Sequence, residues 1–347
     1  MGAALANRAT LQDVAREAGV SVATVDRAIN GRSKVRPETL QKIAEAAHRV
    51  GYHGTGLFQH RLAGDAPRLR MGFLLLKQSQ DFYRNFEREI LKAVAERSDV
   101  RGTAEIRYSS SQSPSEFAAL LQDLGTRCDA IAAVAVNDRQ LDEVVRDLKG
   151  QGVPVFALLN DFAQGIRRSY IGLNNVKVGR LAAWMLTTAA PEPGKLAIFV
   201  GGNRWHGHDL REAGFRSFVR EHDAGFSVLD TVVNLETREV TYEATLDLLH
   251  RHPDLRGLYV AGGGMEGAIA ALREAGASPR VSLVVNELTE QSRSALIDGV
   301  ATMAIVTPLA EVCREVVGRM AVTLSDTGAG GAEQQFLPPK ILLPEAI

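Results

Sequence analysis

Arg27 lies within a stretch whose composition and spacing suit contact with DNA. The stretch "TLQDVAREAGVSVATVDRAIN" covers residues 10–30, and Thr10 and Ser21 are residue types that favour the start of a helix. Hydrophobic residues at helical spacing follow each of them. The pattern predicts two short helices joined by a tight turn, as in a helix-turn-helix. An arginine on the second helix could donate two hydrogen bonds to one guanine.

Three predicted helices with a small apolar core would position Arg27. The first helix is expected to end at Gly19, and a third helix is expected to begin at Pro37 and to end at Gly51. Their inward-facing positions are Leu11, Val14, Ala15, Ala18, Val25, Ala28, Ile29, Leu40, Ile43, Ala44, Ala47 and Val50.

The charge of the chain is uneven along its 347 residues. Residues 1–64 hold nine Lys/Arg and five Asp/Glu, a formal charge of +4, whereas the remaining residues hold 31 and 36, a formal charge of −5. A basic segment attached to an acidic body favours a polyanion-binding head, although +4 alone is a modest signal.

The stretch over residues 10–30, followed by "VRPETLQKIAEAAHRVGY", resembles the DNA-binding head of the LacI family of bacterial repressors. The resemblance implies that the helix over 22–30 enters the major groove. It implies contacts with base edges for Val22, Ala23 and Arg27. It implies contacts with phosphate and sugar for Thr10, Ser21, Thr24, Asn30 and Arg36.

Asp26 departs from the serine that is usual at its position in that family. Two interpretations stay open. Asp26 could pair with Arg27, Lys34 or another basic neighbour and hold it in place, which we favour. Alternatively, its carboxylate could accept a hydrogen bond from a cytosine amino group.

A linker follows the head. The segment "HGTGLFQHRLAGDAPRLR" (residues 53–70) is rich in Gly and polar residues. The resemblance implies a hinge that folds on DNA and inserts a leucine into the minor groove. Leu62 is the expected wedge and Leu57 is the competitor.

The remaining chain alternates hydrophobic strand patterns with amphipathic helices, which predicts an α/β fold with a doubly wound parallel sheet. Nine or ten strands are too many for one compact sheet, so we expect two lobes. "RYSSSQSPSE" (residues 107–116) reads as a polar loop that leads into a helix, and "SDTGAGGAEQQ" (residues 325–335) as a surface loop. The expected divisions are a head over 8–56, a hinge over 57–69, and a two-lobed effector domain over 70–347. Its N-lobe would comprise 70–168 and 302–330, and its C-lobe 169–301 and 331–347.

The body is similar to the type I periplasmic sugar-binding proteins that LacI relatives use as effector domains. Its markers are "FYRNF", "GVPVFAL" and "RWHGHDLREAGF". The resemblance implies a ligand in the cleft between the lobes, with contacts from Asp81, Phe82, Tyr83, Asn160, Asp161, His206, Arg211, Gly262, Glu287 and Thr307. Leu159, Gly262 and Gly263 replace polar residues that are usual in the family, so the expected ligand is a sugar or polyol of unknown identity.

The expected function is a DNA-binding transcriptional regulator, most simply a repressor, that acts as a homodimer on operator DNA, with a tetramer possible. We expect no cofactor, because His206 and His208 lack further ligands for a metal and no catalytic constellation is assembled. Two lone cysteines and no secretory or membrane-spanning segment suggest the cytoplasm. The alternative is a sugar-binding module or sugar-acting enzyme with an accessory helical head.

Overall fold

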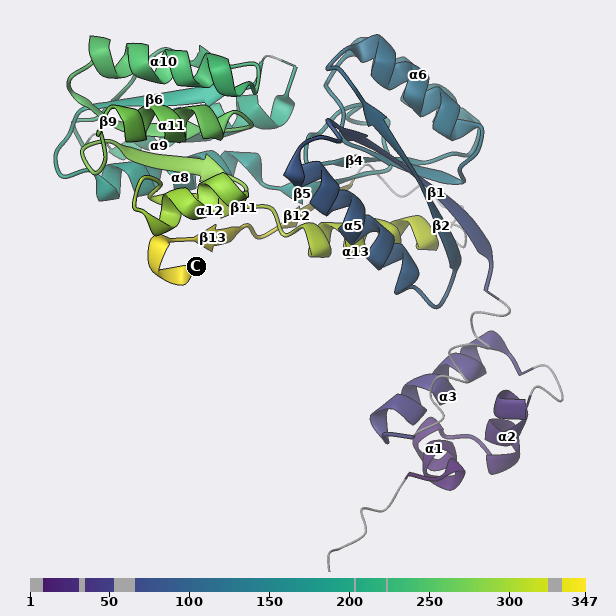
Figure 1. Cartoon of the computed structure of the whole chain (residues 1–347). Helices are drawn as coiled ribbons and strands as arrows, with labels where there is room; N and C mark the ends of the chain where they lie inside the picture. Colours follow the sequence, from purple (N-terminus) through teal and green to yellow (C-terminus); the bar gives the residue numbers. More distant parts are fainter. Residues whose placement is uncertain (1–8, 31–34, 53–65, 203, 223, 324–332) are drawn as a thin grey trace, which may run out of the picture. The chain divides into compact units, whose positions relative to one another are not determined.

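The computed structural model describes residues 9–30, 35–52, 66–202, 204–222, 224–323 and 333–347 (Figure 1). The predicted wedge Leu62, its competitor Leu57 and the hinge up to residue 65 lie outside these residues, so these predictions stay untested.

The helical head consists of α1 (Leu11–Ala18), α2 (Val22–Asn30) and α3 (Pro37–Arg49). Thr10 and Asp13 form a reciprocal capping box at the start of α1, and Gly19 ends that helix with a left-handed φ of 66°. The Oγ of Ser21 accepts a hydrogen bond from the N–H of Thr24 at 3.2 Å, as expected of a helix cap. The structure thus agrees with the predicted end of the first helix at Gly19 and the start of the third at Pro37, whereas α3 ends at Arg49, two residues before the predicted Gly51.

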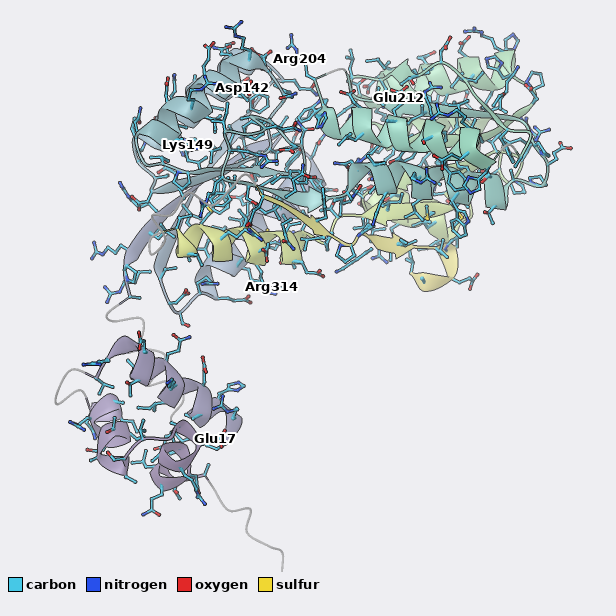
Figure 2. The ribbon with its side chains drawn as sticks, turned by 180° about the vertical axis from the view of Figure 1, so that it is seen from behind. Glu17, Asp142, Lys149, Arg204, Glu212 and Arg314 are labelled. Carbon is cyan, nitrogen blue, oxygen red and sulfur yellow. The ribbon has the colours of Figure 1, made fainter. Side chains whose placement is uncertain are left out.

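The apolar stripes of the three helices meet in one core. Its buried members are Val14, Ala15, Val25, Ala28, Leu40, Ile43, Ala46 and Ala47. At the surface, the carboxylate of Glu17 on α1, labelled in Figure 2, accepts a hydrogen bond from Arg49 of α3 at 2.8 Å. The head thus has its own core and a polar link between its first and last helices.

The N-lobe is built on a six-stranded sheet in the order β12-β5-β4-β3-β1-β2. Helices α5 and α13 lie on one face of this sheet and α6 on the other (Figure 1). The bounds of its elements are β1 (Arg68–Leu76), α5 (Asp81–Ala95), β2 (Arg101–Ser109), α6 (Pro114–Gly125), β3 (Ala130–Ala133), α7 (Arg139–Gly150), β4 (Val155–Leu158), β5 (Ser169–Leu173), α13 (Leu309–Val322) and β12 (Glu333–Leu337).

The C-lobe is built on a seven-stranded sheet in the order β13-β11-β10-β9-β6-β7, with β8 also paired to β6. The bounds of its elements are α8 (Asn175–Ala189), β6 (Lys195–Val200), α9 (His206–His222), β7 (Ser227–Val228), β8 (Val232–Val233), α10 (Arg238–Arg251), β9 (Leu255–Val260), α11 (Met265–Glu274), β10 (Ser282–Asn286), α12 (Glu290–Ile297), β11 (Met303–Val306), β13 (Lys340–Leu342) and the short 3-10 helix η1 (Pro344–Ala346).

Alternate residues of the C-lobe strands supply two cores, one on each face of the sheet. On β6, Ala197 and Phe199 pack with the cluster that contains α10, α11 and α12. Leu196 and Ile198 point the other way, into the cluster that contains α8 and α9. Strands buried on both faces carry continuous hydrophobic runs, which is why these segments were recognisable in the sequence.

The chain passes between the lobes after β5, after β11 and again between β12 and β13. The predicted lobe boundaries are wrong at each of these places. β5 and β12 belong to the N-lobe, because Phe156 of β4 pairs with Ser169 and Glu333 pairs with the same residue from the other side. β11 belongs to the C-lobe, because Val284 of β10 pairs with Met303.

Two local predictions are also corrected. Residues 107–109 form the end of strand β2 rather than a loop, and residues 333–335 begin strand β12. Helix α5 begins at Asp81, so the "DFYRNF" segment is helical from its first residue. The predicted helix that follows residues 107–116 is confirmed as α6, which starts at Pro114.

Candidate functional site

The exposed face of α2 carries the residues expected to read DNA. Val22 is 43% exposed, and Ala23 and Arg27 are also exposed. The Arg27 side chain folds back along the helix: its Nε donates to the carbonyl of Ala23 and its Nη2 to the Oγ1 of Thr24, each at 3.2 Å. The remaining donors of the guanidinium stay available to an outside acceptor.

The partner of Asp26 differs from the favoured interpretation. Its Oδ1 accepts a hydrogen bond at 2.7 Å from the Nδ2 of Asn30, one helical turn later. The basic neighbour Arg27 is bonded elsewhere, and Lys34 lies outside the described residues. Asp26 therefore orients an amide, and Asn30 is itself one of the residues expected to contact the DNA backbone.

A cavity of about 740 Å³ opens where the two lobes of the body meet. Eight of the ten residues expected to bind an effector line it: Asp81, Phe82, Tyr83, Asn160, Arg211, Gly262, Glu287 and Thr307. Asn160, Gly262, Glu287 and Thr307 lie within two residues of the ends of strands, which is where ligands bind in open α/β folds.

Asp161 and His206 are not among the lining residues. Asp161 is only 5% exposed, and both its carboxylate oxygens accept hydrogen bonds from Arg167. The chain turns at Leu159, whose φ is 61°, so that Asn160 reaches the cavity while Asp161 is turned into the N-lobe. His206 is the first residue of α9, and His208, two residues later and therefore on nearly the opposite side of the helix, lines the cavity instead.

Several cavity residues were missed in the sequence, chiefly Trp205, His208, Glu236 and Asn286. Asn286 ends strand β10 and Glu236 lies three residues after β8. The rule that ligand-binding residues follow the carboxyl ends of parallel strands could have identified both.

The floor of the cavity combines a carboxylate and a guanidinium. The Oε2 of Glu287 accepts a hydrogen bond from the N–H of Thr307 at 3.0 Å, and its Oε1 accepts one from the Thr307 hydroxyl. Burial raises the pKa of Glu287, although the two Thr307 hydrogen bonds and Arg211 act in the opposite direction. The Nε of Arg211 donates to Asn175 at 2.7 Å and its Nη1 to the carbonyl of Ala261.

Two buried polar side chains of the C-lobe, of which Asn286 lines the cavity, have no hydrogen-bond partner among the described residues. Neither the Nδ2 nor the Oδ1 of Asn286 has a hydrogen-bond partner within the described residues, and the same holds for the hydroxyl of Tyr259 on the adjacent strand. Buried polar groups are normally paired, so an unpaired amide that lines a cavity is suited to a polar ligand. Burial, with Glu236 and Glu287 nearby, also raises the pKa of Tyr83 well above its usual value, so its hydroxyl stays protonated.

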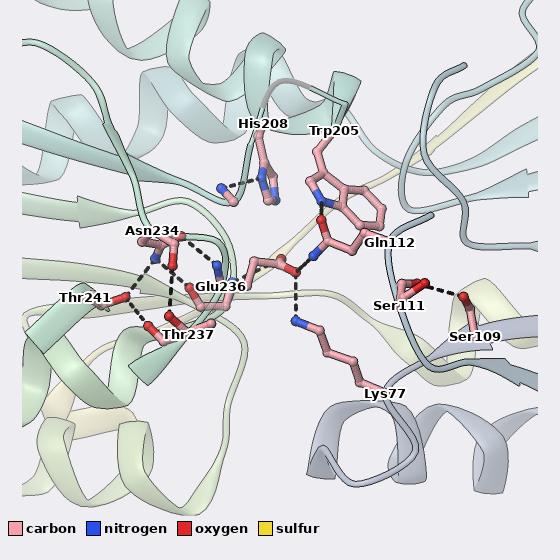
Figure 3. Close-up of polar contacts among 12 residues, drawn as sticks. Lys77, Ser109, Ser111, Gln112, Trp205, His208, Asn234, Glu236, Thr237 and Thr241 are labelled. Atoms are coloured by element: carbon pink, nitrogen blue, oxygen red, sulfur yellow. Dashed lines mark hydrogen bonds and ion pairs between the residues drawn. The ribbon is translucent and has the colours of Figure 1, made fainter. Parts of the chain in front are cut away.

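His208 and Glu236 both line the cavity from the C-lobe (Figure 3). The Nδ1 of His208 accepts a hydrogen bond from the N–H of Gly201 at 3.0 Å, so the neutral ring carries its proton on Nε2. Burial lowers the pKa of His208 to about 4, helped by Arg211 and opposed by Glu236. Burial acts to raise the pKa of Glu236, but its interactions with His208 and Lys77 and the hydrogen bond from the N–H of Gly263 outweigh burial and lower its pKa.

The part of the chain that the structure describes contains no cluster of three or more His, Cys, Asp or Glu side chains able to hold a metal. No helix that the structure describes has the length and apolar character needed to span a bilayer.

Comparisons with known families match both parts of the chain. The periplasmic binding protein domain matches residues 71–326, and the bacterial regulatory proteins of the lacI family match residues 10–54. The chain is 24% identical to the HTH-type transcriptional regulator GalS of Salmonella typhimurium over 77% of its own length and 76% of that protein. It is 31% identical to catabolite control protein A of Priestia megaterium over 42% of each chain.

Solved structures support the fold of the body. An ABC transporter solute-binding protein from Agrobacterium vitis, bound with α-D-tagatopyranose, superimposes with a TM-score of 0.72 over 80% of this chain and 95% of that chain, at 21% identity. A solute-binding protein from Burkholderia graminis in complex with D-arabinose gives a TM-score of 0.73 over 82% of this chain and 96% of that chain, at 18% identity. At these identities the likeness establishes the two-lobed fold alone.

Proposed function

Because the chain belongs to the LacI family of bacterial regulatory proteins, we propose that it is a sequence-specific transcriptional regulator, acting as a repressor, whose affinity for DNA is controlled by a small molecule. The observation that carries this proposal is the pairing, in one chain, of a helix-turn-helix head with a two-lobed domain that contains a polar cavity.

The head would bind DNA through α2. Arg27 is exposed and keeps free donors for a guanine, whereas Val22 and Ala23 offer only apolar contact, for example with a thymine methyl group. Thr10, Ser21, Thr24, Asn30 and Arg36 would contact the backbone and set the orientation of the helix.

The cavity favours an uncharged polar effector. Its lining holds four acidic residues (Asp81, Glu236, Glu266 and Glu287) and four basic ones (Arg84, Arg211, Arg238 and Arg273), so the formal charges cancel. Phe82, Tyr83 and Trp205 add aromatic surface. A sugar or polyol, with hydroxyl groups that both donate and accept and with apolar C–H faces, meets these requirements.

Control by the effector requires that it bind one arrangement of the lobes more tightly than the other. A homodimer would present two heads to the half-sites of a pseudo-palindromic operator. The curated relatives named above are regulators, which favours this function over a sugar-acting enzyme.

Binding to labelled DNA from upstream of the protein's own gene tests the proposal. We expect affinity for one fragment to exceed that for random DNA by at least about a thousandfold and to fall steeply with salt. Arg27→Ala should reduce the preference for that fragment, and Glu38→Ala, which alters an exposed acid in the first turn of α3, serves as a matched control. Equal affinity for all fragments would refute the proposal, and turnover of a sugar by the purified protein would favour the enzyme.

A further inference from the structure

The carboxylate of Glu236, which belongs to the C-lobe, is held by two side chains of the N-lobe (Figure 3). Its Oε2 lies 3.3 Å from the Nζ of Lys77 and accepts a hydrogen bond at 3.1 Å from the Nε2 of Gln112. The side chains of Lys77 and Glu236 are only 24% and 17% exposed. Water therefore screens this ion pair less than it would a surface pair.

Gln112 is in turn positioned by the C-lobe. Its Oε1 accepts a hydrogen bond at 3.0 Å from the indole Nε1 of Trp205, which fixes the orientation of the amide and directs its NH₂ group toward Glu236. Trp205 is 5% exposed and lines the same cavity. Lys77, Glu236, Gln112 and Trp205 thus form a continuous polar chain that crosses between the lobes three times.

The C-lobe is shaped to present Glu236. Leu235 and Glu236 both have left-handed φ angles, 53° and 54°, which are costly for residues other than glycine. The side chain of Asn234 stabilises this turn, because its Oδ1 accepts from the N–H of Glu236 and its Nδ2 donates to the carbonyl of Gly263. A Cβ atom added at Gly201 would lie 2.6 Å from the Glu236 side chain, so the glycine leaves room for it.

We propose that Lys77, Gln112, Trp205 and Glu236 form a latch that holds the two lobes together when no effector is bound. This inference rests on the proposed effector cleft and concerns its regulation. Because Glu236 also lines the cavity, the latch engages a carboxylate that an effector hydroxyl would otherwise bind. The free energy of the latch therefore opposes effector binding.

Trp205 supplies a direct reporter of the latch. The chain has two tryptophans, and the other, Trp184, is 47% exposed on α8. In a Trp184→Phe background, quenching of Trp205 fluorescence by acrylamide measures its access to solvent, without DNA or sugar in the sample. We expect Lys77→Met and Glu236→Gln each to raise the quenching constant at least twofold. The double variant should show no further increase, because both changes remove the same ion pair.

Arg238→Met provides the matched control. Arg238 also lines the cavity and forms no ion pair within the described residues, so its loss should leave the quenching constant unchanged. Unchanged quenching in Lys77→Met would overturn the latch, even if Glu236→Gln altered it, since Glu236 would then only support its own lobe. This result would leave the regulator proposal standing. Conversely, if the unchanged protein showed no sequence preference in DNA binding, the regulator proposal would be refuted, and the quenching of Trp205 would still test the latch.

Discussion

Arg167 donates hydrogen bonds to both carboxylate oxygens of Asp161, and the two side chains are only 2% and 7% exposed. The pair also fastens the last strand of the N-lobe. Arg167 donates to the carbonyl of Glu333 at 3.2 Å, and the amide of Gln334 donates to Asp161 at 3.1 Å. Asp161 thus helps to hold β12 against the rest of the N-lobe sheet.

Breaking this pair should destabilise the N-lobe strongly. Arg167→Met leaves the Asp161 carboxylate buried without its counter-charge, and we expect a loss of about 3–5 kcal/mol in the free energy of unfolding. The double variant Asp161→Leu/Arg167→Met should lose much less, because no buried charge remains. Urea denaturation curves measure both, and equal losses in the single and double variants would contradict this account.

The stability of the C-lobe should depend on pH through His208. Its folded pKa of about 4 lies below the ordinary value of 6.5, so between these limits the unfolded chain binds a proton that the folded chain does not. This stability is fully present above about pH 6.5 and is lost as the pH falls toward 4, by up to about 3 kcal/mol.

His208→Asn keeps an acceptor for the N–H of Gly201 but cannot titrate. Urea unfolding at pH 7 and at pH 4.5 should therefore show a smaller pH-dependent loss in this variant than in the unchanged protein. If both proteins lose the same free energy, His208 does not control this dependence.

Arg27 and Arg36 should affect DNA binding in different ways. Loss of a guanine contact in Arg27→Ala should cost about 1–3 kcal/mol on the preferred sequence and relax the preference at one base pair. Arg36→Ala should weaken binding to all sequences and reduce the slope of log affinity against log salt by about 1. Fluorescence anisotropy across single-base operator variants separates the two, and identical profiles would contradict the assigned roles.

Asp26 should act through Asn30 rather than on a base. Asp26→Ser shortens the side chain that holds the Asn30 amide, so we expect weaker binding with an unchanged ranking of operator variants. Asn30→Ala should reproduce that effect, and the double variant should add little to it. A changed ranking in Asp26→Ser alone would support contact with a cytosine.

Much of the fold was predictable because its signals are local. Capping residues such as Thr10 and Ser21, the glycine that ends α1 and the hydrophobic runs of buried strands all depend on neighbours in the sequence. The membership of β5 and β12 in the N-lobe sheet depends on pairing between residues 169–173 and 333–337. These residues are far apart in the sequence, so no local pattern predicts their pairing.

The cleft was predictable in position but only partly in detail. Residues placed by strand ends, such as Glu287 and Thr307, line the cavity as expected. Asp161 is kept out of the cavity by a single backbone turn at Leu159. Leucine is not a residue type that predicts such a turn. Glu236 was missed because its position at the cavity depends on left-handed backbone conformations at two residues that are not glycine, and the sequence does not predict such conformations there.

The central claim is that occupation of the cleft controls the affinity of the head for DNA. The most direct measurement is the dissociation constant for the preferred upstream fragment, with and without an effector. The effector is the sugar or polyol that most raises the thermal stability of the protein. At 100 times its own dissociation constant, a ligand should add about 2.7 kcal/mol to the free energy of unfolding. We predict that this compound changes the DNA dissociation constant at least fivefold, and that Glu287→Gln greatly reduces both the thermal shift and the change. A compound that stabilises the protein through the cleft yet leaves the DNA dissociation constant unchanged would contradict the account.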